Sequence, residues 1–204
     1  GELGAYSHIA AENLYKDPEI KTCTTFEETF KQAYNDPSYK IVIPIENSLA
    51  GRVADIHYLL PKYKLQIHGE HFQAVEHNLL CKPDATISDI KFVRSHAQAI
   101  GQCQNLIAKK KFKPIISADT AGSAKDLAEG KDITIAAIAS ELSAKIYNLK
   151  ILEKNIEDEK GNVTRFLIMG KNIEQPEFKK EKKFITSCIF RVKSEPSALY
   201  KCLG

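Results

Sequence analysis

Long apolar runs, paired cysteines and arginine are all scarce in this chain of 204 residues. No stretch approaches the roughly 18 consecutive apolar residues that a membrane helix needs. The run at residues 133–139 is short and contains Thr134. The first residues are neither basic nor strongly apolar, so we expect no signal peptide and no membrane partner.

The five cysteines form no Cys-x-x-Cys pair and are odd in number. This pattern fits reduced thiols, and we therefore expect a cytoplasmic protein. Six scattered histidines offer no ligand spacing for zinc, so no metal site is expected. No glycine-rich phosphate-binding motif occurs.

Charge is nearly balanced, with 29 Lys and Arg against 26 Asp and Glu. Five Lys and three Glu fall within residues 171–183, so this stretch holds two of the three net positive charges. The remainder is close to neutral and gives no electrostatic footprint for nucleic acid. Because the charged stretch also contains Pro176, we interpret it as a linker. The 43% of hydrophobic residues is typical of a globular chain with a real core.

Hydrophobic periodicity predicts strands that alternate with helices. Thr25 and Glu28 form a capping box at the start of one helix, and Gly130 is expected to end another in a left-handed conformation. The alternation predicts an α/β fold with helices covering a mostly parallel sheet. The expected helices are residues 25–34, 55–60 (capped by Asp55 and ended near Pro61), 96–109, 119–129 and 139–147. The expected strands are residues 41–45, 65–72, 74–80, 92–94, 114–117, 133–136, 151–152, 164–168 and 184–192.

Four junctions between a strand end and a helix start carry small or hydroxyl residues. Ligands bind at such junctions in parallel sheets, and helix N-termini favour anions. The same residue types also cap helices for stability alone, so an anion-binding cleft and plain capping both remain open. The junctions are residues 4–7, 46–51, 95–98 and 119–123.

A further segment, residues 161–170, places Thr164 and Phe166 on one strand face and Arg165 on the other, as any strand would. The side chains of His57, His68, His71 and His77 are expected to make structural contacts.

Read in order, these segments resemble the prephenate dehydratase family. The similar strings are Gly-Glu-Leu-Gly-Ala-Tyr-Ser-His at residues 1–8, Ile-Pro-Ile-Glu-Asn-Ser at 43–48 with Gly51, Ser-His-Ala-Gln-Ala at 95–99, Asp-Thr-Ala-Gly at 119–122, Ala-Ala-Ile-Ala-Ser at 136–140 and Asn-Val-Thr-Arg-Phe at 162–166. Residues 184–204 resemble the start of an ACT regulatory domain. Ala97 stands where the family commonly has Pro, and Ser197 where Gly is common.

The resemblance implies a two-lobed, periplasmic-binding-protein-like (type II) α/β fold with a cleft between the lobes. Lobe one would be about 1–75 plus 160–178, and lobe two about 76–159. Residues 1–178 would form the catalytic domain, and residues 179–204 the linker end and the truncated start of an α+β ACT domain. A homodimer or homotetramer with L-phenylalanine as feedback effector is also implied.

The implied activity is the decarboxylating dehydration of prephenate to phenylpyruvate in phenylalanine biosynthesis, without a metal, nucleotide or flavin cofactor. Thr164 would donate to the leaving hydroxyl group. Arogenate as the substrate, or a non-catalytic anion sensor of the same fold, remain alternatives. The implied substrate-binding residues are Ala5, Tyr6, Ser7, Asn47, Ser48, Ser95, His96, Gln98, Gln102, Thr120, Ala121, Arg165 and Phe166.

Overall fold

The computed structural model describes residues 1–172, 177–184 and 190–203. Gly1–Ile173 form one compact unit and Glu174–Gly204 form a second. In the second unit, the predicted strand at residues 184–192 lies mostly outside the described residues, and a short helix, α8 (Ala198–Leu203), is observed. No helix in the described ranges is long and apolar enough to cross a membrane.

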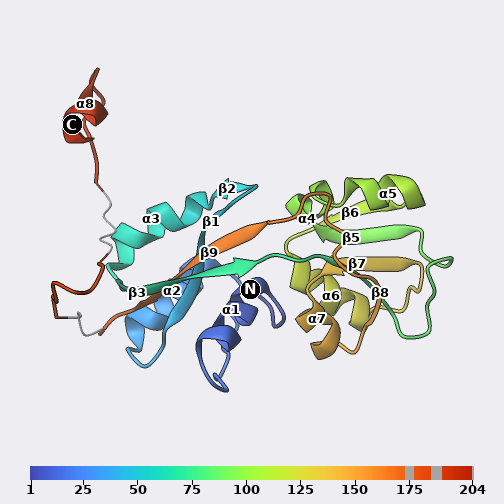
Figure 1. Cartoon of the computed structure of the whole chain (residues 1–204). Coiled ribbons are helices and arrows are strands. Elements are labelled where there is room, and N and C mark those ends of the chain that lie inside the picture. Colours follow the sequence, from blue (N-terminus) through green and yellow to red (C-terminus); the bar gives the residue numbers. More distant parts are fainter. Residues whose placement is uncertain (173–176, 185–189, 204) are drawn as a thin grey trace. The chain divides into compact units, whose positions relative to one another are not determined.

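Two separate sheets form the centre of the first unit (Figure 1). The four-stranded sheet, in the order β2-β1-β9-β3, is antiparallel throughout. The five-stranded sheet has the order β6-β5-β7-β4-β8. The strands are β1 (Ile41–Asn47), β2 (Gly51–Arg52), β3 (Gln66–Ala74), β4 (Asn78–Cys81), β5 (Phe92–His96), β6 (Lys113–Ser117), β7 (Ile135–Ala139), β8 (Lys150–Glu153) and β9 (Val163–Gly170).

Each sheet and its helices form one lobe, which confirms the two-lobed α/β fold class. We call the four-stranded sheet with α1, α2 and α3 lobe one, and the five-stranded sheet with α4 to α7 lobe two (Figure 1). The helices are α1 (Tyr6–Leu14), α2 (Phe26–Asn35), α3 (Ala54–Tyr63), α4 (Ala97–Gly101), α5 (Gln104–Lys110), α6 (Thr120–Glu129) and α7 (Glu141–Ile146).

The prediction of a mostly parallel sheet is wrong. Among the described strand pairs, only β5 with β6 and β5 with β7 are parallel. In lobe one, β1, α3 and β3 form a strand–helix–strand unit whose two strands do run in the same direction. However, β9 returns from far along the sequence and inserts between them, antiparallel to both. Local periodicity carries no information about this insertion.

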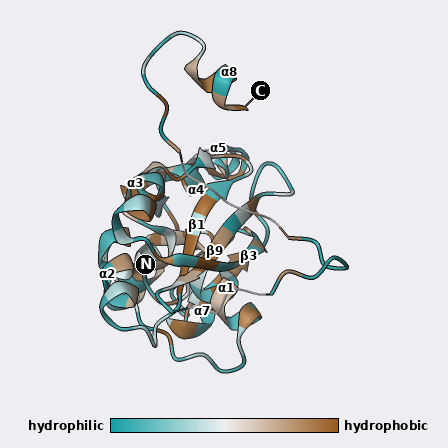
Figure 2. Cartoon of the chain, turned by 90° about the vertical axis from the view of Figure 1, so that its left-hand side faces the viewer, coloured by the Kyte–Doolittle hydropathy of each residue, from teal (hydrophilic) through white to brown (hydrophobic). Residues whose placement is uncertain are grey.

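The hydrophobic core follows the alternation of side chains along the strands. In lobe two, Leu79 belongs to a cluster on one face of the sheet, and its neighbour Leu80 belongs to the cluster on the other. In lobe one, Leu167 and Met169 of β9 pack with Phe30 of α2. Figure 2 shows brown, hydrophobic segments along β1 and β9, whereas teal predominates on the surrounding helices and loops.

The helix predicted from Thr25 is confirmed as α2, and the Thr25 hydroxyl accepts from the backbone N–H of Glu28 at 3.1 Å. The second half of the capping box differs, because the Glu28 carboxylate accepts from the backbone N–H of Thr24 at 2.8 Å. Gly130 does end α6, but its φ of −68° is not left-handed. A Cβ atom there would lie 3.0 Å from the carbonyl oxygen of Asp126, which explains why glycine fits this position.

Two other predicted helices are observed with different bounds. Helix α3 starts after Val53 without a side-chain cap and continues through Pro61 to Tyr63, whose ring lies 5.7 Å from that of Phe30. The single helix expected over residues 96–109 is divided into α4 and α5. After the break, the Asp158 carboxylate accepts from the first backbone N–H groups of α5, at 2.8 and 3.0 Å, and so stabilises a new helix start.

Candidate functional site

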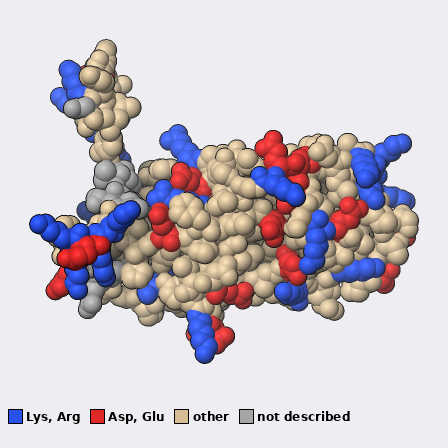
Figure 3. Space-filling model, in the orientation of Figure 1, with Lys and Arg blue, Asp and Glu red and all other residues tan. Residues whose placement is uncertain are grey.

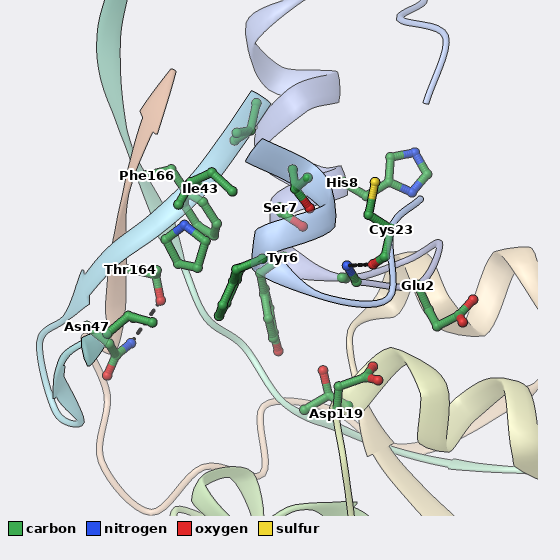
Figure 4. Close-up of a pocket in the computed structure, with 18 of the residues that line it drawn as sticks. Glu2, Tyr6, Ser7, His8, Cys23, Ile43, Asn47, Asp119, Thr164 and Phe166 are labelled. Carbon is green, nitrogen blue, oxygen red and sulfur yellow. Dashed lines mark hydrogen bonds between the residues drawn. The ribbon is translucent and has the colours of Figure 1, made fainter. Parts of the chain in front are cut away.

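A cavity of about 700 Å³ is lined by residues of both lobes. Lobe one contributes the start of α1 and parts of β1, β2 and β9, and lobe two contributes α4 and the start of α6. Figure 4 shows side chains of α1, β1 and β9 around the cavity, together with Asp119, which precedes α6. Ten of the predicted site residues line it: Ala5, Tyr6, Ser7, Asn47, His96, Gln98, Gln102, Thr120, Thr164 and Phe166.

The other four predicted site residues are Ser48, Ser95, Ala121 and Arg165, which do not line this cavity. The Ser95 hydroxyl donates to a carbonyl oxygen of β7 at 2.7 Å, and the Ser48 hydroxyl accepts from the first backbone N–H of β9 at 2.9 Å. Ala121 is fully buried in α6. On the opposite sheet face, the Arg165 guanidinium binds the carboxylates of Glu70 at 2.8 Å and Glu46 at 3.1 Å. Ser95 and Arg165 therefore form hydrogen bonds that connect strands within the two sheets, and Ser48 connects the residue after β1 to β9.

Thr164 and Phe166 lie on the cavity face of β9, and they are 8% and 2% exposed. The Oγ1 atom of Thr164 accepts a hydrogen bond from Nδ2 of Asn47 at 2.9 Å (Figure 4). Within the described part of the chain, the Thr164 hydroxyl donates to no group. Its hydrogen is therefore available to a ligand in the cavity.

A series of hydrogen bonds continues from Asn47 into lobe two. Nδ2 of Asn47 donates to Oδ1 of Asn162 at 2.6 Å, and Nδ2 of Asn162 donates to Oε1 of Gln102 at 2.9 Å. The same Gln102 oxygen lies 3.0 Å from Nε2 of His77, whose Nδ1 lies 3.0 Å from the Tyr6 hydroxyl. Because Asn162 and His77 lie on the two segments that cross between the sheets, this Asn47 network, which includes Thr164, joins the lobes.

Burial keeps the ionisable members of the network neutral. Desolvation lowers the pKa of His77, although the hydrogen bond to Gln102 and the charge of Glu157 act in the opposite direction. Desolvation also raises the pKa of the Tyr6 phenol, and the nearby Glu157 carboxylate adds to that effect. At neutral pH the network thus provides directed dipoles and no net charge.

Lobe two presents polar side chains to the cavity that form no hydrogen bond with the described residues. Gln98 and Thr120 line the cavity, and neither side chain has a hydrogen-bond partner among the described residues. The N-terminus of α6 beside them is capped by Asp119, whose carboxylate accepts from the Gly122 amide at 2.6 Å. Across the cavity, α1 begins without a side-chain cap, so its first amides can bind an anion.

Several lining residues are not among the predicted site residues: His77, Asn162, Arg52 and Asp119. Two of them, Asp119 and Asn162, nevertheless lie in the strings that carry the resemblance. Asn162 belongs to the string that ends in Phe166, but its partner Gln102 is far away in sequence. Arg52 lies on the short strand β2 and makes no ion pair with any described residue. No spacing signal identifies it. In the described ranges no cluster of three or more His, Cys, Asp or Glu could hold a metal ion.

Comparison with known proteins gives concordant results. A family model described as "Prephenate dehydratase" matches residues 1–174. The chain is 38% identical to a "Bifunctional N-acyl-homoserine lactone acylase/prephenate dehydratase" of Komagataeibacter europaeus, over 100% of this chain and 72% of that protein. It is 39% identical to "Arogenate dehydratase/prephenate dehydratase 2, chloroplastic" of Arabidopsis thaliana, over 100% of this chain. The chain spans only 53% of that relative's length.

The fold is also similar to that of a solved structure, a prephenate dehydratase of Arthrobacter aurescens in complex with L-Phe. The TM-score is 0.80 at 25% sequence identity, and the match covers 88% of this chain and 60% of the other.

Proposed function

The chain belongs to the prephenate dehydratase family, and we propose that it converts prephenate to phenylpyruvate, CO2 and water. One observation carries this proposal. The buried Thr164 hydroxyl lines a cavity between two lobes, accepts from Asn47, and keeps its own hydrogen free. A donor in this state suits a reaction in which negative charge develops on a leaving oxygen.

The reaction breaks two bonds of prephenate. One is the C–C bond between the ring and its carboxylate, and the other is the C–O bond between the ring and its hydroxyl. The ring carboxylate departs as CO2, and the electron pair of the broken C–C bond moves into the ring. The ring C–O bond breaks at the opposite carbon, and the ring becomes aromatic. The dianion therefore yields the phenylpyruvate monoanion, CO2 and hydroxide, which takes up a proton to become water. A threonine hydroxyl is a weak acid, so Thr164 acts through its position as a hydrogen-bond donor to the departing oxygen.

Binding of the substrate requires groups that can hold two carboxylates. The unused side chains of Gln98 and Thr120, the open amides at the start of α1 and the Arg52 guanidinium line the same cavity. Phe166 lies next to Thr164 on the same face of β9, where its ring can contact the substrate ring. These roles account for a dianionic, partly apolar substrate.

Arogenate is a second candidate substrate, because the Arabidopsis relative is named for both activities. The test is phenylpyruvate formation from prephenate by the full-length protein, with phenylalanine formation from arogenate measured in parallel. We expect prephenate to have the higher kcat/KM. A higher kcat/KM for arogenate would reverse the substrate assignment, and turnover of neither would favour the non-catalytic sensor.

Regulation is a separate proposal. We propose that residues 1–178 form the catalytic domain, that residues 179–204 begin an ACT domain, and that L-phenylalanine inhibits a homodimer or homotetramer through it. The support is the resemblance of residues 184–204 and the L-Phe complex of the Arthrobacter relative. Limited proteolysis tests the domain boundary and should cut within residues 171–183. Sedimentation with and without L-phenylalanine measures the oligomeric state. Cleavage inside residues 1–170 instead would contradict the boundary.

A further inference from the structure

The direction of the Asn47 network is fixed at one end by the backbone. Oδ1 of Asn47 accepts from the backbone N–H groups of Leu49 and Ala50, at 3.0 and 2.8 Å. A backbone N–H can only donate, so the oxygen and nitrogen of this side-chain amide cannot exchange places. The Nδ2 atom must therefore face Thr164 and Asn162.

This orientation determines where the Thr164 hydroxyl points. Nδ2 of Asn47 donates to Oγ1 of Thr164, which leaves the hydroxyl with a donor on one side and one hydrogen of its own. No acceptor for that hydrogen exists among the described residues. Because Thr164 lines the cavity, the open direction is toward a ligand.

The orientation of Asn47 also fixes the donor and acceptor atoms of the hydrogen bonds that lead into lobe two. Since Oδ1 of Asn162 accepts from Asn47, its Nδ2 must donate to Oε1 of Gln102. That oxygen also lies 3.0 Å from Nε2 of His77. Nδ1 of the same ring lies 3.0 Å from the Tyr6 hydroxyl, which donates its hydrogen to the carbonyl oxygen of Glu76 at 2.7 Å. The Nε2 group of Gln102 has no partner in the described part of the chain, so both its hydrogens remain free beside the cavity.

We propose that Asn47 is a positioning residue that aims two donors, the Thr164 hydroxyl and the Gln102 amide, into the cavity. This inference rests on the proposed function, because a departing hydroxide and a carboxylate are what such donors stabilise. It differs from the substrate-binding role that the resemblance implies for Asn47. The Asn47 amide is fully used by Leu49, Ala50, Asn162 and Thr164.

The variant Asn47→Asp tests this directly, because it keeps the size of the side chain and removes the hydrogen bonds that Nδ2 donates to Thr164 and Asn162. One carboxylate oxygen can still accept from the two backbone amides of the turn. The other would now accept from Thr164, which turns the hydroxyl away from the substrate. We expect kcat to fall about 10²–10³-fold, as when one donor to a developing anion is lost, with a smaller change in KM. Unchanged kcat would overturn the proposal.

A double-mutant cycle separates positioning from a structural role. If Asn47 acts through the Thr164 hydroxyl, Asn47→Asp should lower kcat less than about threefold in a Thr164→Val background, because coupled sites are not additive. Multiplied losses would overturn the inference. If Thr164→Val itself turns over normally, the catalytic role of Thr164 fails instead. A loss in Thr164→Val without one in Asn47→Asp removes only the positioning role.

Asn162→Asp provides a second test, needed if Asn47→Asp does not fold. It still accepts from Asn47 but no longer donates to Gln102, so the Gln102 amide should turn toward it and leave the cavity. We expect KM to rise about tenfold, the value of one hydrogen bond to a charged group, with kcat changed less than threefold. A fall in kcat at constant KM, or no change, would contradict the proposal. The matched control is Asn13→Asp, whose exposed amide bonds Gln73 outside the cavity.

Discussion

Two pairs of polar side chains, one pair from each lobe, line the cavity in opposite states. In lobe one, Asn47 and Thr164 are held by hydrogen bonds to each other and to the protein, so their geometry exists before a ligand arrives. In lobe two, Gln98 and Thr120 face the same cavity with no protein partner among the described residues. We therefore propose that the held pair in lobe one acts on the leaving hydroxyl, where preorganised donors lower a barrier, and that the free pair in lobe two acts in substrate binding.

The lobes also differ in the pairing of single arginine side chains, although not in the distribution of charge on the face that Figure 3 presents. Figure 3 shows positive and negative side chains interspersed on the face of residues 1–172 that it presents, without a broad patch of one sign there. Arg52 of lobe one lines the cavity and makes no ion pair with any described residue. Arg94 of lobe two does not line it and is paired with Asp126 at 3.3 Å. We therefore expect Arg52 to contribute charge to ligand binding and Arg94 to contribute none.

The largest expected effect is on Thr164. Replacing it by Val keeps the shape and removes the hydroxyl, and we expect kcat to fall about 10²–10³-fold. Thr164→Ser keeps the hydroxyl and should retain considerably more activity. Steady-state kinetics on protein shown to be folded by circular dichroism gives the answer. Near-normal kcat in Thr164→Val would place the reaction elsewhere and remove the contrast between the lobes.

A second prediction concerns the free side chains of lobe two. The combined change Gln98→Leu and Thr120→Val should raise KM for prephenate at least about tenfold, since each removes a hydrogen bond to a charged group. The same variant should keep kcat within about threefold, because these groups bind the substrate without contacting the leaving hydroxyl. Gln73→Leu, outside the cavity, is the control. A large fall in kcat at constant KM would show that lobe two takes part in the chemistry.

A third, smaller effect is expected for Arg52. Because this guanidinium lies on β2 and is exposed to solvent, its attraction for a carboxylate is screened. Arg52→Gln should raise KM about threefold at low salt, and the difference from the unaltered protein should shrink as salt is added. Arg94→Gln is the matched control. An equal rise in KM for both variants would mean that overall charge, and not the position of Arg52, matters.

The smallest effect is on stability and involves His77. Burial lowers the pKa of His77 in the folded state, so the unfolded chain binds more protons below the ordinary histidine pKa of about 6.5. The free energy of unfolding should therefore fall as pH drops from 7 to 5.5, and His77→Gln should weaken this dependence. Denaturant titrations at several pH values measure it, with the exposed His68→Gln as control. An unchanged slope in His77→Gln would contradict the assignment.

Much of the fold could be predicted from local pattern, and the errors have tertiary causes. Thr25 and Glu28 predicted α2, because both capping residues lie at the start of that helix, and the structure shows Phe30 and Ala33 on its buried face. The break between α4 and α5 could not be predicted, since its cap is Asp158, more than fifty positions away. The insertion of β9 between β1 and β3 is non-local in the same way.

For the candidate site, most of the predicted residues line the cavity, but the hydrogen bonds that join them were not predicted. The resemblance named ten residues that line the cavity, and all of them except Gln102 lie in the quoted strings. Strand alternation already placed Arg165 opposite Thr164, and the structure shows it bound to Glu46 and Glu70. The link from Asn47 through Asn162 to Gln102 joins three separate parts of the sequence, and no spacing within one string encodes it.

The most direct measurement is a crystal structure of the full-length Thr164→Ser variant soaked briefly with prephenate and frozen before turnover. We expect the ring hydroxyl to lie within about 3 Å of the residue 164 hydroxyl, in hydrogen-bond range. We expect the side-chain carboxylate to lie at Gln98 and Thr120. Prephenate bound in the reverse orientation, with its ring hydroxyl at Gln98 and a carboxylate at residue 164, would contradict the division of binding and chemistry between the lobes.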